Sequence, residues 1–190
     1  MDKLVSCIVR KISQTNPEFS ELDVKKMEYG LLCFFDEITK LISFYIIFYL
    51  FSLQQYYLVT FMFFCPVRLF SGGYHAKTYW GCFIMSLLIF FMIIAIGKNF
   101  IFGNVVHITI MFISLLLIFI FSPVDNINKR IKSNERRLKL KYLSILITIT
   151  LCGLTYILPI KYLATGVTSI LAAVLMMLFG SLNNKLESKY

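Results

Sequence analysis

Charged side chains are scarce in this sequence of 190 residues. Only 15% of them are Asp, Glu, Lys or Arg, 58% are hydrophobic, and the mean hydropathy is +0.77. Soluble domains are typically about one quarter charged and about half apolar. A domain of this size cannot bury so much apolar surface in its own core. The composition therefore excludes an ordinary soluble domain and indicates an integral membrane protein.

The sequence also lacks the marks of a secreted or metal-binding protein. Its first 30 residues alternate charged and apolar side chains, without the continuous apolar core of a cleavable signal peptide. The cysteines are odd in number and scattered, and no CxxC pair indicates a metal site. We therefore expect neither a metal nor another cofactor, and we expect all cysteines except Cys82 to be small buried apolar residues. The five cysteines are Cys7, Cys33, Cys65, Cys82 and Cys152.

Five windows without charge, 19 to 27 residues long, meet or approach the roughly 20 residues that a spanning helix needs. The longest, 41–67, is either one tilted helix or two segments that turn near residue 54. With the turn and a cytosolic N-terminus, 17 of the 19 Lys and Arg residues lie inside and only Lys98 and Lys161 lie outside. A single crossing gives at best 11 against 8. The positive-inside rule favours the turn, with both termini cytosolic.

The sequence thus predicts an all-α integral membrane protein of about six transmembrane segments, preceded by an N-terminal amphipathic helix at the membrane interface. Leu4, Ile8 and Ile12 recur every four residues beside basic side chains, as in interfacial helices. The expected segments are 30–53, 55–69, 79–97, 101–122, 141–158 and 161–182. We expect one domain, 1–190, divided into 1–29 (amphipathic region), 30–69 (first two segments), 70–78 (loop), 79–122 (segments three and four), 123–140 (basic cytosolic loop), 141–182 (segments five and six) and 183–190 (tail).

The first two segments carry features that are costly in a bilayer. The second arm of the turn is only some 22 Å long as a helix, so it tilts, thins the bilayer or follows a re-entrant path. The first segment contains Asp36, Glu37 and Lys40, and Asp36 and Lys40 have the spacing to pair. These polar groups form either a salt bridge at the cytosolic end or a carboxylate wall of an active site.

The stretch RLFSGGYHAKTYWGC, residues 68–82, lies between segments two and three on the cytosolic side. A thiolate at Cys82, near a helix N-terminus and an imidazole at His75, has the chemistry for acyl transfer through a thioester. On one continuous helix the two residues would be about 10.5 Å apart, so the chain must fold back, which Gly72 and Gly73 permit. Alternatively, Cys82 is a buried apolar residue and His75 binds a main-chain carbonyl. His107 lies near the outer surface or in a helix contact.

This stretch resembles the core of the accessory gene regulator B (AgrB) family, membrane cysteine peptidases of Gram-positive quorum sensing. The family pattern of an arginine, a glycine turn, a histidine, six residues and a cysteine matches Arg68, Gly72, Gly73, His75 and Cys82. The segment SPVDNINKRIKSNERRLKLK, from Ser122, is similar to the proline-led basic loop of that family. The resemblance covers essentially the whole chain and implies an enzyme that cleaves a short pro-peptide through a thioester on the cytosolic face and promotes its cyclisation to a thiolactone or lactone.

The resemblance also implies residue roles. Cys82 is the nucleophile, His75 is the general base and acid, and main-chain amides at the start of segment three hold the oxyanion. Arg68 either anchors the helix end to lipid phosphate or binds a carboxylate. The basic loop either anchors the topology on anionic lipid or holds an acidic substrate tail. Its basic residues are Lys129, Arg130, Lys132, Arg136, Arg137, Lys139 and Lys141.

The expected partners are a small AgrD-like pro-peptide, the bilayer of the cell membrane and a second copy in a homodimer, with no nucleic acid. Two other functions stay open from the residues alone. A small membrane transporter or peptide exporter would need charges near mid-membrane and paired broken helices, which the sequence does not show. A membrane acyltransferase acting on lipid would also use a histidine or a cysteine.

Overall fold

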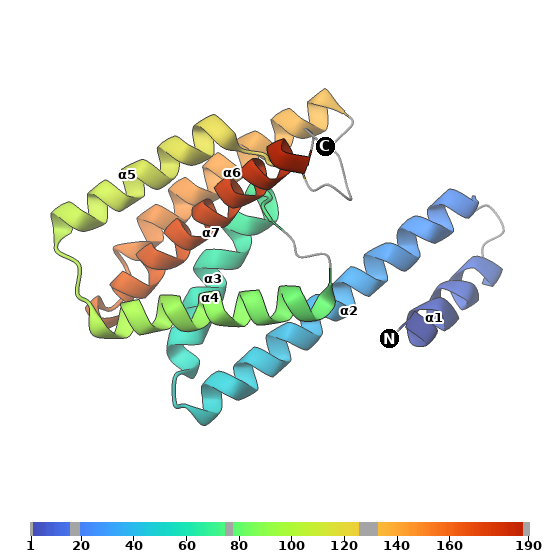
Figure 1. Ribbon diagram of the computed structural model, residues 1–190, viewed down its shortest axis with the longest axis horizontal. Coiled ribbons are helices and arrows are strands. Elements are labelled where there is room, and N and C mark those ends of the chain that lie inside the picture. Colours follow the sequence, from blue (N-terminus) through green and yellow to red (C-terminus); the bar gives the residue numbers. More distant parts are fainter. Residues whose placement is uncertain (1, 16–19, 75–77, 126–132, 188–190) are drawn as a thin grey trace. The chain divides into compact units, whose positions relative to one another are not determined.

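The structure is a computed structural model, and it describes residues 2–15, 20–74, 78–125 and 133–187 (Figure 1). These residues are helical apart from connecting turns and one isolated bridge between Gly72 and Val124, so the all-α prediction is confirmed for them. The chain forms two compact units, Met1–Leu50 and Phe51–Tyr190. The helices are α1 (Asp2–Thr15), α2 (Glu21–Leu50), α3 (Gln54–Ser71), α4 (Tyr79–Asn99), α5 (Asn104–Phe121), α6 (Asn134–Thr155) and α7 (Ile160–Glu187).

The first unit consists of α1 and α2, which pack against each other. Val5 and Val9, one turn apart on α1, are buried, whereas Ile12 is exposed. Val5 and Val9 lie beside Leu4, Ile8 and Ile12 on the predicted apolar side, and their burial follows the contact with α2. The position of α1 at a membrane interface stays a prediction.

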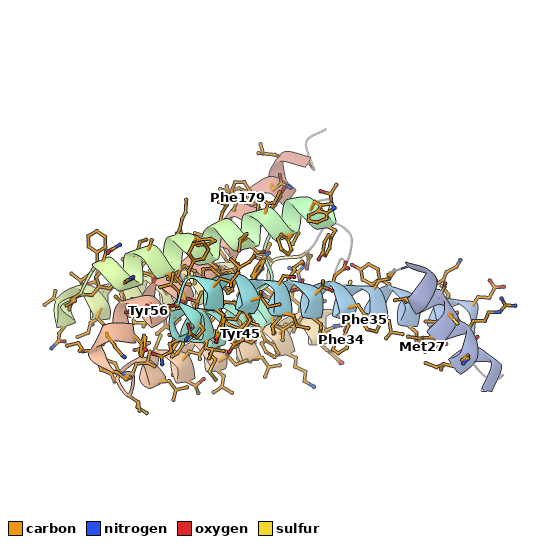
Figure 2. All side chains as sticks on the ribbon, turned by 90° about the horizontal axis from the view of Figure 1, so that it is seen from below. Met27, Phe34, Phe35, Tyr45, Tyr56 and Phe179 are labelled. Atoms are coloured by element: carbon orange, nitrogen blue, oxygen red, sulfur yellow. The ribbon has the colours of Figure 1, made fainter. Side chains whose placement is uncertain are left out.

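Helix α2 begins at Glu21, nine residues before the predicted segment. Ser20 caps it, accepting a hydrogen bond from the Asp23 amide at 3.3 Å and donating to the Asp23 carboxylate at 2.6 Å. Farther along, the buried ammonium of Lys40 pairs with Glu37 at 2.8 Å. Figure 2 shows the aromatic side chains of Phe34 and Tyr45 along this helix, both of them exposed. Charged residues thus occur on α2 as far as Lys40, and the helix is uncharged from Leu41 to its end at Leu50.

The window 41–67 is divided between two helices, as the charge pattern indicated. Helix α2 ends at Leu50 and α3 begins at Gln54, with Ser52 at a positive φ of 55° between them. Helix α3 has 18 residues, which is about 27 Å at 1.5 Å per residue. It is therefore longer than the sequence predicted and close to the roughly 30 Å of a hydrocarbon core.

Helix α7 is the centre of the second unit. It packs against α3, α4, α5 and α6, and most extensively against α3, while α5, α6 and α7 lie side by side (Figure 1). Of its apolar window 61% is buried, against 22–28% for those of α4, α5 and α6. Small residues permit the close approach of α4 and α7. A methyl carbon added to Gly97 on α4 would lie only 2.1 Å from the hydroxyl oxygen of Thr165 on α7, so a larger residue would not fit there.

Among the described residues, four helices are long and apolar enough to cross a membrane: α4, α5, α6 and α7. This is compatible with a multi-pass membrane protein. Helix α2 falls outside the set because it carries the three charges near Lys40, and α3 because it begins with two glutamines and includes Arg68. The count of six crossings, the cell membrane as location and the cytosolic termini stay predictions.

Candidate functional site

Cys82 lies in the first turn of α4, and its side chain is buried. The helix is capped by Thr78, whose hydroxyl accepts a hydrogen bond from the Gly81 amide at 3.1 Å. The carbonyl of Thr78 accepts the amide of Cys82 at 3.0 Å. The main chain of Cys82 is therefore part of a capped helix N-terminus, and the N-terminus of a helix carries a partial positive charge.

The two glycines of the motif form a turn directly after α3. Gly72 has φ +77° and Gly73 has φ +144°, in the range that side chains other than hydrogen rarely allow. Space is also limiting, because a methyl carbon at Gly72 would lie 2.2 Å from the carbonyl oxygen of Val124. One at Gly73 would lie 3.1 Å from the Met176 carbonyl oxygen of α7. The turn therefore requires glycine for both conformation and close approach.

Tyr74, which follows the glycines, is fixed by both α3 and α7. Its amide donates to the carbonyl of Met176 at 3.1 Å, and its carbonyl accepts from the guanidinium of Arg68. Its ring packs edge-on against Phe179 of α7, with ring centroids 5.0 Å apart (Figure 2 labels Phe179). Gly180 leaves room for this, since a methyl carbon there would lie 2.5 Å from the Tyr74 nitrogen. The chain is thus anchored at the residue before His75.

Arg68 is accordingly a structural donor to the main chain. Its guanidinium holds the Tyr74 carbonyl and lies over the ring of Phe64, 5.9 Å from the centroid. The sequence suggested a lipid phosphate or a carboxylate as its partner, and those roles stay predictions. The contact to Tyr74 was missed because a backbone acceptor leaves no signature in the sequence.

A second segment, Ser122–Asp125, lies against this turn. The amide of Val124 donates to the carbonyl of Ser71 at 2.9 Å. Asp125 is tied to α6 by an ion pair with Arg137 and to α7 by a hydrogen bond from Asn184 to its carbonyl at 2.6 Å. Nothing in the sequence signalled Asp125. Its segment contacts the glycine turn through Val124, which is more than 50 positions from Ser71 and Gly72 in the chain.

Four of the predicted site residues lie outside the described part of the chain: His75, Lys129, Arg130 and Lys132. Other residues of the basic loop are described, at the start of α6. Arg136 and Lys139 are exposed, Arg137 pairs with Asp125, and the ammonium of Lys141 lies 5.1 Å from the ring centroid of Phe119.

The second histidine is a helix contact, one of the two places expected for it. His107 is buried between α5 and α6, with Nε2 2.9 Å from the hydroxyl of Thr155 and its ring stacked on Tyr156. The five cysteines, all of them described, form no disulfide. Cys82 is buried, and Cys65 and Cys152 are half-buried. Cys7 and Cys33 are exposed, contrary to the expectation of burial.

Comparison with known proteins gives a consistent result. Residues 3–180 match the family described as Accessory gene regulator B. An AgrB-like protein of Clostridium beijerinckii is 30% identical over 152 residues, which are 80% of this chain and 72% of the relative. An AgrB-like protein of Clostridium acetobutylicum is 26% identical over 168 residues, 88% and 80% of the two chains. Accessory gene regulator protein B of Staphylococcus aureus is 26% identical over 144 residues, 76% of each. No solved structure matches.

Proposed function

This chain belongs to the accessory gene regulator B family, and from that premise we propose that it is a membrane-embedded cysteine endopeptidase. Family membership by itself points to a role in accessory gene regulation, which is quorum sensing. The finer proposal is that the protein cleaves a quorum-sensing pro-peptide on the cytosolic face and promotes closure of a thiolactone or lactone ring in the signal peptide.

The chemistry assigns one step to each residue. The thiolate of Cys82 attacks the carbonyl carbon of the scissile peptide bond, so a C–S bond forms and the C–N bond breaks. His75 removes the thiol proton and returns it to the departing amine of the C-terminal fragment. A thiol or hydroxyl within the bound peptide then attacks the thioester carbonyl and loses its proton to His75. The ring closes, the Cys82 sulfur is released, and no oxidant or reductant is consumed.

The oxyanion of each tetrahedral intermediate needs hydrogen-bond donors that are not already bonded to other groups of the protein. The amides of Gly81 and Cys82 are both engaged by Thr78. That main-chain amides at the start of α4 hold the oxyanion stays a proposal, and Gly81 and Cys82 would have to release their bonds to Thr78 to take part. Exclusion of water from this site favours ring closure over hydrolysis of the thioester.

The observation that carries the proposal is the pairing of two rigid anchors on either side of the histidine. Cys82 is buried in the capped first turn of α4, and Tyr74 is fixed on α3 and α7. Only residues 75–77 separate Tyr74 from Thr78. Three residues span at most about 11 Å, so the chain length alone limits how far His75 can lie from Tyr74 and Thr78.

The proposal is tested by expressing the protein in a heterologous membrane with a pro-peptide from the small open reading frame beside its gene. Cleavage and ring closure are read by mass spectrometry. Cys82→Ala should abolish the cleaved product, whereas Cys152→Ala, which removes a half-buried thiol of α6, should leave it unchanged. Undiminished cleavage by the Cys82→Ala variant would remove the peptidase assignment.

A further inference from the structure

We propose that one face of α6 binds a single anionic phospholipid, whose phosphate contacts Arg136 and Lys139 and whose acyl chain lies in the apolar hollow that continues from them. The inference concerns the membrane and does not depend on the proposed peptidase function. It goes beyond a general attraction between basic residues and the membrane surface, because it assigns one lipid molecule to one side of one helix.

A hollow of about 510 Å³ lies on the surface of α6. Lys139 and Tyr142 are at its start, and apolar side chains line the rest of it. Tyr142, Leu146 and Ile149 are 70%, 58% and 52% exposed, so the described part of the protein leaves this side of α6 largely uncovered. The residues that line the hollow are Lys139, Tyr142, Leu143, Ile145, Leu146 and Ile149.

Two of the four basic residues at the start of α6 are engaged by the protein. Arg137 forms an ion pair with Asp125, which follows α5. The ammonium of Lys141 lies 5.1 Å from the ring centroid of Phe119 on α5. These two cations therefore face neighbouring segments of the chain and are not available to a ligand on the opposite side of α6.

The other two basic residues face the hollow. Helix periodicity places Arg136 and Lys139 on the same side of α6 as Leu143, away from the buried Ser144. Both are exposed, and neither forms an ion pair with a residue that the structure describes. Glu135 is exposed beside them, also without such a pair. This side of the helix thus combines a net positive charge with an uncovered apolar surface.

The dimensions of the hollow fit one leaflet of a bilayer. Ile149 follows Tyr142 by seven residues, which is about 10 Å along a helix. The acyl chains of one leaflet occupy half of a hydrocarbon core of about 30 Å. Lys139 lies nearly one turn before Tyr142, where a lysine can extend to the headgroups, and tyrosine itself is enriched at that interface.

Charge and shape together favour a phospholipid over other ligands of this face. An acidic peptide would neutralise the two cations but would leave the apolar hollow open to the bilayer. A second copy related by a two-fold axis along the membrane normal would bring Lys139 of both chains to the same depth, where like charges repel. An anionic phospholipid satisfies the cations with its phosphate and fills the hollow with its chain.

The test is a titration of the full-length protein in detergent with phosphatidylglycerol, which is anionic, or phosphatidylcholine, which is zwitterionic. Binding is read as a rise in Tm and its stoichiometry by native mass spectrometry. Phosphatidylglycerol should saturate at one lipid per protein and bind more tightly than phosphatidylcholine. Because a basic residue near an anionic lipid typically strengthens binding about fivefold, Arg136→Gln and Lys139→Gln should each weaken it by about that factor. Lys98→Gln, at the exposed end of α4, should have no effect.

Leu146→Trp tests the acyl chain separately from the headgroup. The larger ring occupies the hollow while both cations stay in place, so the affinity for phosphatidylglycerol should fall at least several-fold. The control is Leu88→Trp on α4, because Leu88 is 55% exposed, which is close to the 58% of Leu146, and it does not line the hollow. This control should bind phosphatidylglycerol as the wild type does.

Three results would overturn the inference. Equal, unsaturated stabilisation by both lipids would mean that only unspecific lipid surrounds α6. Efficient crosslinking of an Ile149→Cys variant to itself in membranes would show that a second copy covers the hollow. If the two glutamine variants bind phosphatidylglycerol as the wild type does but bind the pro-peptide more weakly, the cations serve an acidic peptide instead.

Discussion

At the scale of single residues, Gly72 determines the path of the chain between α3 and the motif. Its φ of +77° lies in the left-handed region, where a residue with a side chain is less stable by about 1–2 kcal/mol. Gly72→Ala also introduces a carbon 2.2 Å from the Val124 carbonyl oxygen. We expect the variant to lose cleavage activity and to lower the apparent Tm in detergent by at least about 2–4 °C.

A loop glycine without these constraints provides the control for Gly72. Gly103 precedes α5 with φ −68°, and a methyl carbon there meets no atom within 4 Å. Gly103→Ala should therefore retain both Tm and activity. Equal effects of the two substitutions, measured by a thermal shift and by mass spectrometry of the product, would show that the turn does not depend on the positive φ.

Among the candidate site residues, the sequence proposed a nucleophile and a base, which stay predictions, and it missed the contacts that hold the surrounding chain. Cys82 could be placed near a helix start because the glycines and Lys77 mark the boundary of an apolar segment, and the structure places it in the first turn of α4. The partners of Arg68 and Asp125 could not be predicted, since one is a main-chain carbonyl and the others lie on distant helices. Such contacts depend on tertiary packing, which hydropathy and motif spacing do not describe.

At the scale of helices, hydropathy located the apolar stretches but not the polar ends of the helices. Helix α6 begins at Asn134, seven residues before the predicted 141, because Ser133 caps it and its basic first turns are helical. Helix α2 likewise extends nine residues before its predicted start. Charged residues form helix as readily as apolar ones when a cap is present, so a membrane window underestimates helix length.

The crossing of α4 and α7 depends on the small residue Gly97. A methyl carbon there would lie 2.1 Å from Oγ1 and 2.8 Å from Cα of Thr165, whose side chain is fully buried. We expect Gly97→Ala to lower the free energy of unfolding by about 1–3 kcal/mol, the usual cost of overpacking. Thr165→Ala in the same chain should restore part of it, because the nearest atom is removed while Cα remains.

The measurement for the α4–α7 crossing is a double-mutant cycle of thermal stability in detergent, with Gly97→Ala, Thr165→Ala and the pair. Gly153 on α6 is the control, since a methyl carbon there meets nothing within 4 Å. Gly153→Ala should be neutral or slightly stabilising, as alanine favours helix. Additive effects in the cycle, without rescue, would contradict close contact between the two residues.

At the scale of the whole molecule, the distribution of basic residues predicts the orientation in the membrane. With six crossings, 17 of 19 Lys and Arg lie on one side, which the positive-inside rule assigns to the cytosol. The four most apolar helices, α4 to α7, give the same sides for every loop after residue 77. The difference between four and six crossings therefore lies entirely in whether α2 and α3 traverse the bilayer.

The break between α2 and α3 at residues 51–53 decides this question, because the two topologies place it on opposite sides. In a variant without the five native cysteines, Ser52→Cys should react with a membrane-impermeant maleimide only from outside if α3 crosses, as Lys98→Cys should in either case. Lys77→Cys should react only from the cytosolic side, in inside-out vesicles.

Labelling of Ser52→Cys from the cytosolic side would reduce the protein to four crossings. Helix α3 would then be re-entrant or would lie at the membrane interface, as short helices can when protein surrounds them. Labelling of Lys77→Cys from outside would invert the orientation, and it would move the thiol of Cys82 away from any cytosolic peptide.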